Sequence, residues 1–206
     1  MQKSDALAVG YHALPPGHLA NVVTCLEMTE RPHLRAVPAG GFSLQDMGGD
    51  TARFKRLFEA VGRDIMWFSR LIMAEDKLAA IIGDAAVECY AMMDGADDIG
   101  LLELDFREAG QCELSFFGLV PGAIGKGAGR WLMNEALRRA WAKPISRLWV
   151  HTCSFDHPAA LGFYQRSGFR PYQVMVEVHP DPRLTGHMPK DASPAAPLIE
   201  VQSLQT

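Results

Sequence analysis

The sequence has no excess of basic residues, no long apolar run and no closely spaced cysteines. Its 206 residues carry 20 Lys and Arg against 24 Asp and Glu, a formal charge of -4. Such a chain offers little positive charge to a nucleic-acid backbone. No stretch approaches the ~18 apolar residues of a membrane span, and the N-terminal residues lack the apolar core of a secretory signal. We therefore expect neither a nucleic acid nor a membrane as partner.

The four cysteines are Cys25, Cys89, Cys112 and Cys153. They form no Cys-x-x-Cys pair and have no histidine at zinc-finger spacing, so we expect no metal site. We interpret them as reduced core thiols of a cytoplasmic protein. No serine or cysteine lies in a Gly-x-Ser-x-Gly type of nucleophile turn either.

What is present fits one globular domain. Hydrophobic residues make up 48% and charged residues 21% of the chain, which is ordinary for a folded protein of this length. We expect an N-terminal arm over residues 1–18, a domain over 19–179 and a tail over 180–206 whose order the sequence leaves open.

Hydrophobic periodicity and turn residues predict the elements. The first half is expected to hold a strand over 20–28, a loop over 31–49, a helix over 50–62 capped by Asp50, a helix over 75–82, and strands over 86–92, 99–106 and 111–120. The second half is expected to hold a helix over 130–142, a strand over 147–152, a helix over 157–166 capped by Asp156, and a strand over 169–178. This order predicts a mixed α/β sheet.

A glycine-rich loop, PGAIGKGAG at 121–129, separates the last strand of the first half from a helix. Backbone N–H groups at a helix start lack internal partners and attract anions, and glycines let a phosphate approach them. Lys126 and Arg130 add positive charge. A P-loop is a poor match, since Val120 stands where its first glycine belongs and Gly127 where its hydroxyl belongs. A dinucleotide fingerprint would need glycine at Arg130.

The chain resembles the GNAT superfamily of acetyl-CoA-dependent N-acyltransferases. Its loop IGKGAG at 124–129 matches the family's Gln/Arg-x-x-Gly-x-Gly/Ala, with Ile124 at the Gln/Arg position. A second motif matches in register at Ala160, Phe163, Tyr164, Gly168 and Phe169. The resemblance implies an α/β (α+β) GNAT fold, in which a mixed, mostly antiparallel central sheet has splayed middle strands and is flanked by helices.

The resemblance also implies acetyl-CoA as co-substrate and no metal. Backbone N–H groups near Gly118 and Leu119 would stabilise the oxyanion, and the same segment would pair with the pantetheine arm. His157 stands where the family often has asparagine. The implied cofactor-binding residues are Gly118, Leu119, Val120, Ile124, Gly125, Lys126, Gly127, Ala128, Gly129, Arg130 and His157.

Two residues are candidates for catalysis. Glu113 lies on the strand before the loop, where histone-type family members carry a general base, and strand alternation is expected to place it on one face with Ser115 and Phe117. Glu103, Asp105 and His151 are alternatives to Glu113. We expect a buried structural role for His151. The resemblance implies that Tyr164 protonates the leaving thiolate.

These observations predict transfer of an acetyl group from acetyl-CoA to a primary amine of a small molecule or peptide, by direct attack in a ternary complex. Three alternatives stay open: a non-catalytic acyl-CoA sensor of the same fold, transfer of another acyl group or transfer to a hydroxyl, and a nucleotide-binding ATPase, for which we expect no phosphate release from ATP. The sequence does not identify the acceptor, although Trp67, Phe68 and Met73 could line an apolar pocket for it. It also leaves a homodimer open.

Overall fold

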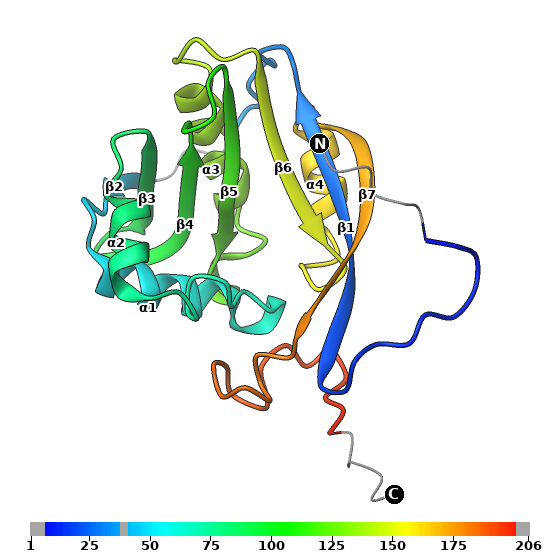
Figure 1. The fold of residues 1–206 in the computed structure, drawn as a ribbon. Helices are drawn as coiled ribbons and strands as arrows, with labels where there is room; N and C mark the ends of the chain where they lie inside the picture. The colour runs from blue at the N-terminus through cyan, green and yellow to red at the C-terminus, as the bar shows by residue number, and fades with distance from the viewer. Residues whose placement is uncertain (1–6, 38–40, 201–206) are drawn as a thin grey trace, which may run out of the picture.

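The chain folds around one seven-stranded sheet with the strand order β2-β3-β4-β5-β6-β1-β7 (Figure 1). The computed structural model describes residues 7–37 and 41–200. The strands are β1 (His18–Met28), β2 (Phe42–Asp46), β3 (Val87–Asp94), β4 (Asp97–Asp105), β5 (Gln111–Leu119), β6 (Arg147–Cys153) and β7 (Arg170–Pro180). Every neighbouring pair is antiparallel except β5 and β6. The expected mixed, mostly antiparallel sheet is confirmed.

The two central strands separate along their length. Strands β5 and β6 pair only where residues 111–113 lie opposite residues 147–149. Beyond Glu113 and Trp149 the strands diverge, so one edge of β5 has no neighbouring strand over residues 114–119 within the described chain. This confirms the expected splay, and the gap contains the candidate site.

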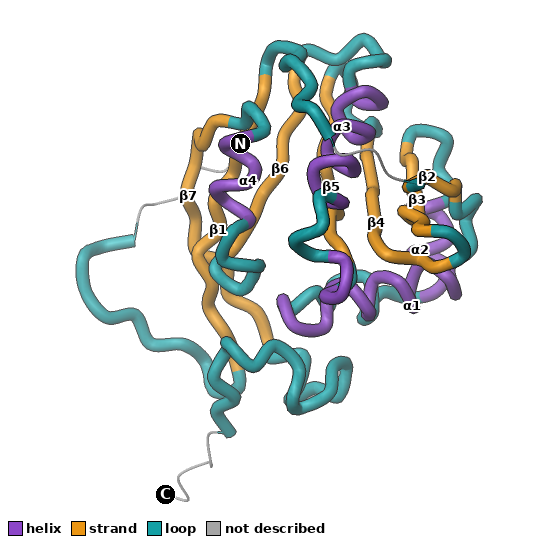
Figure 2. The backbone as a smooth tube through the Cα atoms, turned by 180° about the vertical axis from the view of Figure 1, so that it is seen from behind, coloured by secondary structure: helices purple, strands orange, loops and turns teal. Residues whose placement is uncertain are grey.

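Two pairs of helices cover the two faces of the sheet (Figure 2). Helices α1 (Thr51–Gly62) and α2 (Glu75–Ile82) bury one hydrophobic cluster, and α3 (Ala128–Ala140) and α4 (Ala160–Arg166) bury another on the opposite face. Asp50 caps α1 as predicted, because its carboxylate accepts the N–H of Arg53 at 2.9 Å. Within the described residues, no helix is both long and apolar enough to cross a bilayer.

Three local predictions were wrong. The Pro- and Gly-rich stretch 31–49, expected as a loop, contains β2, whose Phe42 and Leu44 pack against the core while the strand pairs with β3. Helix α4 begins at Ala160 rather than at residue 157, and Ala159 is its N-cap. Asp156 does not cap it, because its carboxylate accepts the hydroxyl of Thr152 at 2.6 Å and the N–H of Cys153 at 2.9 Å.

A bulge in β5 changes which side chains share a face. The β4–β5 register shifts so that Glu103 faces Phe116 while Leu104 faces Leu114, which leaves Ser115 as the extra residue. Phe116 therefore packs with α1, and Phe117 packs with α3 and α4. The expected grouping of Glu113, Ser115 and Phe117 on one face is wrong, because strand alternation breaks at the bulge.

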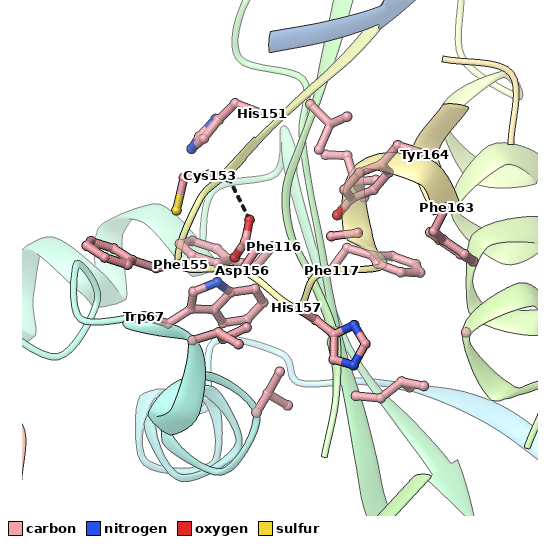
Figure 3. A pocket seen from close by; sticks show the side chains of 18 of the residues that line it. Trp67, Phe116, Phe117, His151, Cys153, Phe155, Asp156, His157, Phe163 and Tyr164 are labelled. Carbon is pink, nitrogen blue, oxygen red and sulfur yellow. Dashed lines mark hydrogen bonds between the residues drawn. The ribbon is translucent and has the colours of Figure 1, made fainter. Parts of the chain in front are cut away.

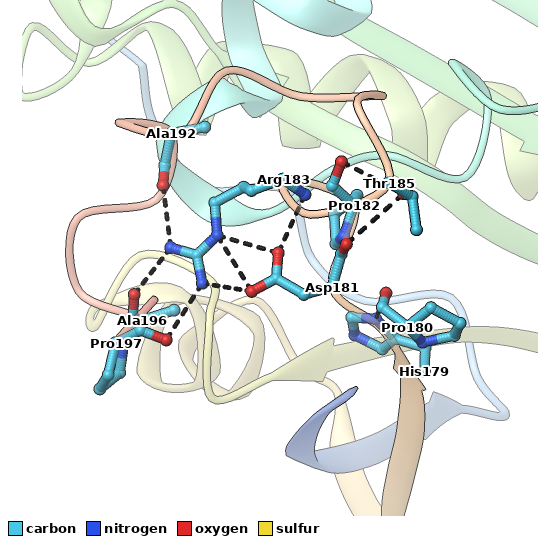
Figure 4. Close-up of polar contacts among 9 residues, drawn as sticks. All are labelled: His179, Pro180, Asp181, Pro182, Arg183, Thr185, Ala192, Ala196 and Pro197. Carbon is cyan, nitrogen blue, oxygen red and sulfur yellow. Dashed lines mark hydrogen bonds and ion pairs between the residues drawn. The ribbon is translucent and has the colours of Figure 1, made fainter. Parts of the chain in front are cut away.

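The residues after β7 pack back against the body of the molecule (Figure 4). Arg183, 3% exposed, is held by the carboxylate of Asp181 and donates to the carbonyls of Ala192, Ala196 and Pro197. The N–H of Ser193 also donates to the carbonyl of Arg63 at 3.0 Å. The segment 181–197 thereby fastens the end of β7 to the chain that follows α1. Residues 1–6 of the expected arm and 201–206 of the expected tail lie outside the described residues.

Candidate active site

The gap between β5 and β6 opens into a cleft of about 920 Å³. Its lining comes from the glycine-rich loop and α4 on one side, and from the chain after α1 and the ends of β1 and β7 on the other. Figure 3 shows aromatic side chains from both sides of the sheet pointing into this space.

The glycine-rich loop carries a row of backbone amides at the cleft, which its Gly125, Gly127 and Gly129 line. Gly125 and Gly127 have φ values of +86° and +85°, a left-handed conformation that favours glycine. Helix α3 begins at Ala128, two residues earlier than predicted, so Ala128 and Gly129 belong to its first turn. Within the described chain, the N–H groups of residues 125–129 have no hydrogen-bond partner. Such a row at a helix start fits a diphosphate.

The exposed edge of β5 supplies further N–H groups. The N–H of Val120 donates to the carbonyl of Ile99 on the β4 side at 2.9 Å. Because donors alternate between the two edges of a strand, the N–H groups of Leu119 and Phe117 point into the gap and that of Gly118 points to β4. The carbonyl of Val120 accepts the N–H of Ala123, so both backbone groups of Val120 are already used.

Gly118 has a packing role. A Cβ at this position would lie 2.4 Å from Val61 and 3.0 Å from Trp67. The absence of a side chain lets α1 and the indole of Trp67 approach the sheet beside the gap. Gly129, in contrast, has room for a Cβ, which would meet Leu119 at 3.7 Å and Phe163 at 3.9 Å, both ordinary contact distances.

Glu113 lies at the point where β5 and β6 separate. Its side chain is 26% exposed and lines the cleft. Burial, together with the neighbouring carboxylates Asp105 and Glu103, raises the pKa of Glu113 to about 7. A carboxylate with a pKa near neutrality suits proton abstraction, because it is partly deprotonated at neutral pH yet basic enough to accept a proton.

The alternatives on β4 are occupied by arginines. Glu103 is fully buried and paired with Arg70, which also lies over the ring of Phe116 at 5.1 Å. Burial raises the pKa of Glu103. Asp105 lines the cleft, but Arg107 holds it with a 2.5 Å contact. Of these three carboxylates, only Glu113 lacks an arginine partner among the described residues.

His151 is not the buried structural residue that the sequence predicts. Its side chain is 49% exposed, lines the cleft, and has Nδ1 3.7 Å from the nearer oxygen of Glu113. Its two neighbours on β6, Val150 and Thr152, are buried instead. The strand therefore turns His151 toward the gap that opens beyond Trp149.

Tyr164 reaches the cleft from α4. Its ring packs against Phe169 and Phe117, with centroids 5.8 and 6.2 Å away, and its hydroxyl points into the cleft (Figure 3). The hydroxyl has no hydrogen-bond partner among the described residues. Burial and the charge of Asp156 raise the pKa of Tyr164, so the phenol stays protonated and can donate.

Most of the sequence-predicted cofactor residues line the cleft, but three do not. Those that line it are Gly118, Leu119, Ile124, Gly125, Gly127, Gly129, Arg130 and His157. Val120, Lys126 and Ala128 are absent from the lining: the side chain of Lys126 is exposed to solvent and that of Ala128 is buried against the core.

Sequence reasoning missed several residues of the cleft. Arg35 lines it beside the glycine-rich loop, where Arg130 donates to the carbonyl of Ala36 at 3.2 Å. On the other side lie Asn21, Arg70, Phe155, Glu177 and His179. No local motif marks these positions. Trp67 and Phe68 do line the cleft, whereas Met73 packs in the cluster under α1 and α2.

The amino-acid sequence matches one protein-family model over more than half of the chain. Residues 56–169 match the model of the Acetyltransferase (GNAT) family. The chain belongs to the GNAT acetyltransferase family. Glu113, the glycine-rich loop and Tyr164 all lie within the matched residues. Among curated proteins, none matches this chain. The described residues hold no group of three or more His, Cys, Asp or Glu arranged to bind a metal.

Solved structures with the same fold are distant in sequence. A GCN5-related N-acetyltransferase from Sphaerobacter thermophilus is 14% identical, with a TM-score of 0.58. The match covers 79% of this chain and 53% of the Sphaerobacter protein. A putative GNAT acetyltransferase from Novosphingobium aromaticivorans is 17% identical (TM-score 0.54), and the match covers 81% of this chain and 68% of that protein. An IAA acetyltransferase from Bacillus cereus is 21% identical (TM-score 0.51), and the match covers 65% of this chain and 79% of that protein. This chain therefore spans about half the length of the first of these.

Proposed function

We propose that this GNAT protein transfers an acetyl group from acetyl-CoA to a primary amine of a small molecule or peptide. One observation carries the proposal: a single cleft is lined by Gly125, Gly127 and Gly129, whose amides have no partner among the described residues, and by Glu113, a carboxylate whose pKa burial raises to about 7. The first feature fits a diphosphate, and the second fits removal of a proton from an ammonium group.

The residues of the loop hold the co-substrate. The N–H groups of 125–129 bind its diphosphate, and Arg35 and Arg130 add positive charge at the same end of the cleft. The N–H groups of Leu119 and Phe117, on the open edge of β5, extend from there toward Glu113. They pair with the pantetheine arm and donate to the carbonyl oxygen of the thioester.

Glu113 acts on the amine. An alkyl ammonium has a pKa near ~10.4 and is not nucleophilic until it loses a proton. Glu113 takes that proton and passes it to solvent, directly or through His151, whose ring lies 3.7 Å away. The freed nitrogen forms a bond to the thioester carbon. Collapse of the tetrahedral adduct breaks the carbon–sulfur bond and leaves an amide.

Tyr164 acts on the sulfur. Its neutral phenol donates a proton to the leaving thiolate, and the second proton lost by the nitrogen restores the phenol. The two catalytic groups thus work from different layers of the fold, Glu113 from the sheet and Tyr164 from α4.

The chemistry of the cysteines favours direct attack over an acetyl-enzyme intermediate. Cys153 is the cysteine that lines the cleft. Burial and the charge of Asp156 raise its pKa to about 11, so at neutral pH it is almost entirely the unreactive thiol. Burial also raises the pKa values of Cys25, Cys89 and Cys112.

A thiol-release assay tests the proposal. Purified protein, acetyl-CoA and a panel of polyamines, amino acids, aminoglycosides and peptides should release CoA thiol with at least one acceptor, and the product mass should show one added acetyl group. Initial rates at varied concentrations of both substrates should give intersecting double-reciprocal lines. Parallel lines together with an acetylated Cys153 would contradict direct attack. Binding of acetyl-CoA without transfer to any acceptor would favour the sensor, and a preference for another acyl-CoA would correct the acyl group.

A further inference from the structure

The end of the cleft opposite the glycine-rich loop carries Glu177, an exposed residue whose carboxylate has no ion-pair partner among the described residues. Glu177 lies on β7 opposite Asn21 on β1, and both line the cleft. Within the described chain, the only hydrogen bond to the Glu177 side chain comes from Nδ2 of Asn21, at 3.0 Å. Among the same residues, Glu177 forms no ion pair with any lysine, arginine or histidine.

Asn21 adds a second acceptor at the same place. Its side chain is buried, with 3% exposure, and its Oδ1 has no hydrogen-bond partner in the part of the chain that the structure describes. A carboxylate can only accept, so the amide must turn Nδ2 toward Glu177, and this fixes Oδ1 as a free acceptor. A buried acceptor without a donor is unfavourable. Among the described residues, Oδ1 of Asn21 therefore lacks a donor and Glu177 lacks a cationic partner.

Aromatic rings lie around His179, which follows Glu177 by two residues on β7. Phe68, from the segment after α1, lies 4.7 Å from the ring of His179, and Phe155, after β6, lies 6.5 Å from it. All three line the cleft. Phenyl faces attract an alkyl ammonium and also pack against methylene groups. The surroundings thus fit a cation carried on an aliphatic chain.

The C-terminal segment holds this wall in place. Met188, Ala192 and Ala196 pack against Met66 and Phe68, and the N–H of Ser193 donates to the carbonyl of Arg63. Buried Arg183 ties the segment together through three carbonyls (Figure 4). Phe68 and the end of β7 are therefore held by contacts with the C-terminal segment, as a preformed binding wall requires.

We propose that the acceptor is a diamine or polyamine whose second ammonium group is bound by Glu177 and Asn21. This inference rests on the proposed function, because it places the reacting nitrogen at Glu113. Both nitrogens of such an acceptor are protonated at neutral pH. Glu113 removes a proton from one, and Glu177 retains the charge of the other. The basic side chains Arg35 and Arg130 at the opposite end of the cleft direct the dication to this end.

Matched acceptors test this inference. The rates of thiol release are measured with 1,n-diaminoalkanes of three to eight carbons and with n-alkylamines of equal length. The best diamine should exceed its monoamine in kcat/KM by roughly 10- to 100-fold, the effect expected of one charge-assisted hydrogen bond. Glu177→Gln should reduce this ratio to below about threefold by raising KM for the diamine. Glu59→Gln, an exposed position on α1 outside the cleft, should leave the ratio unchanged.

The outcomes separate this inference from the function on which it rests. Equal use of monoamines and diamines, or a ratio that Glu177→Gln does not alter, overturns the diamine site while acetyl transfer stands. If no amine is acetylated, the proposed function fails, and calorimetric titration of 1,4-diaminobutane into the CoA-loaded protein decides the site by itself. Binding that Glu177→Gln weakens at least tenfold supports the site, and equal or absent binding overturns it.

Discussion

The two sides of the cleft are built in different ways. On the side of the glycine-rich loop, the groups that face the ligand are main-chain amides supplied by residues 125–129 in one continuous turn. On the opposite side they are side chains from distant parts of the chain: Asn21 and Glu177 are hydrogen-bonded although they lie 156 positions apart. The first arrangement suits a ligand common to a whole family, and the second can change residue by residue with the acceptor.

Removing the base should have the largest effect. Glu113→Gln keeps the shape of the side chain but cannot accept the proton, so kcat/KM should fall by roughly 10²- to 10⁴-fold. In the unaltered protein kcat/KM should rise as pH increases through about 7, because Glu113 is active only when deprotonated. That rise should disappear in the variant. A pH profile of the variant that retains a rise near pH 7 would assign the base to another group, with His151 next to be tested.

Removing the acid should have a smaller effect, since a thiolate is already a good leaving group. Tyr164→Phe keeps the ring contacts with Phe117 and Phe169 and should preserve the thermal midpoint. We expect kcat to fall by roughly 10- to 100-fold with little change in KM for acetyl-CoA. Steady-state kinetics and thermal unfolding measure both. An unchanged kcat would leave Tyr164 with a packing role only.

A strained backbone in the glycine-rich loop should weaken the binding of acetyl-CoA but not that of the amine. Gly127→Val places a β-branched residue at φ +85° and costs about 1–3 kcal/mol in the loop conformation, so KM for acetyl-CoA should rise about tenfold. KM for the amine should change little. Gly122→Ala is the matched control, because this nearby glycine does not have positive φ and a Cβ added there would meet no described atom within 4 Å. Equal effects of the two substitutions would remove the special role of the turn.

The smallest effects should come from the charges around Glu113, and they should have opposite signs. Asp105 raises the pKa of Glu113 and Arg107 lowers it. Asp105→Asn should therefore move the rise in kcat/KM to lower pH, and Arg107→Gln should move it to higher pH. We expect the shift in Arg107→Gln to stay below about one pH unit, because the side chain of Arg107 is partly exposed and solvent screens its charge. Shifts in the same direction would show that the rise does not report the titration of Glu113.

The contrast between the two sides also explains what the sequence could predict. The glycine-rich loop and the α4 motif could be predicted, because their glycines, the adjacent Phe163 and Tyr164, and the order of the flanking strands are visible in the local sequence. The bulge at Ser115 could not be read, because its effect depends on the register with β4. His151 is exposed because β5 and β6 separate beyond Trp149, and this separation is a feature of tertiary structure that local sequence does not show. Asn21, Phe155 and Glu177 line one cleft only when β1, β6 and β7 assemble, so no single stretch of sequence marks them.

Calorimetric titration of acetyl-CoA into the purified protein tests the central claim most directly. If the amides of 125–129 form the diphosphate site, the titration should saturate at one molecule per chain, and the affinity should decrease in Gly127→Val but not in Gly122→Ala. A titration of the unaltered protein that shows no saturable heat, with no rise in thermal midpoint on adding acetyl-CoA, would contradict the account.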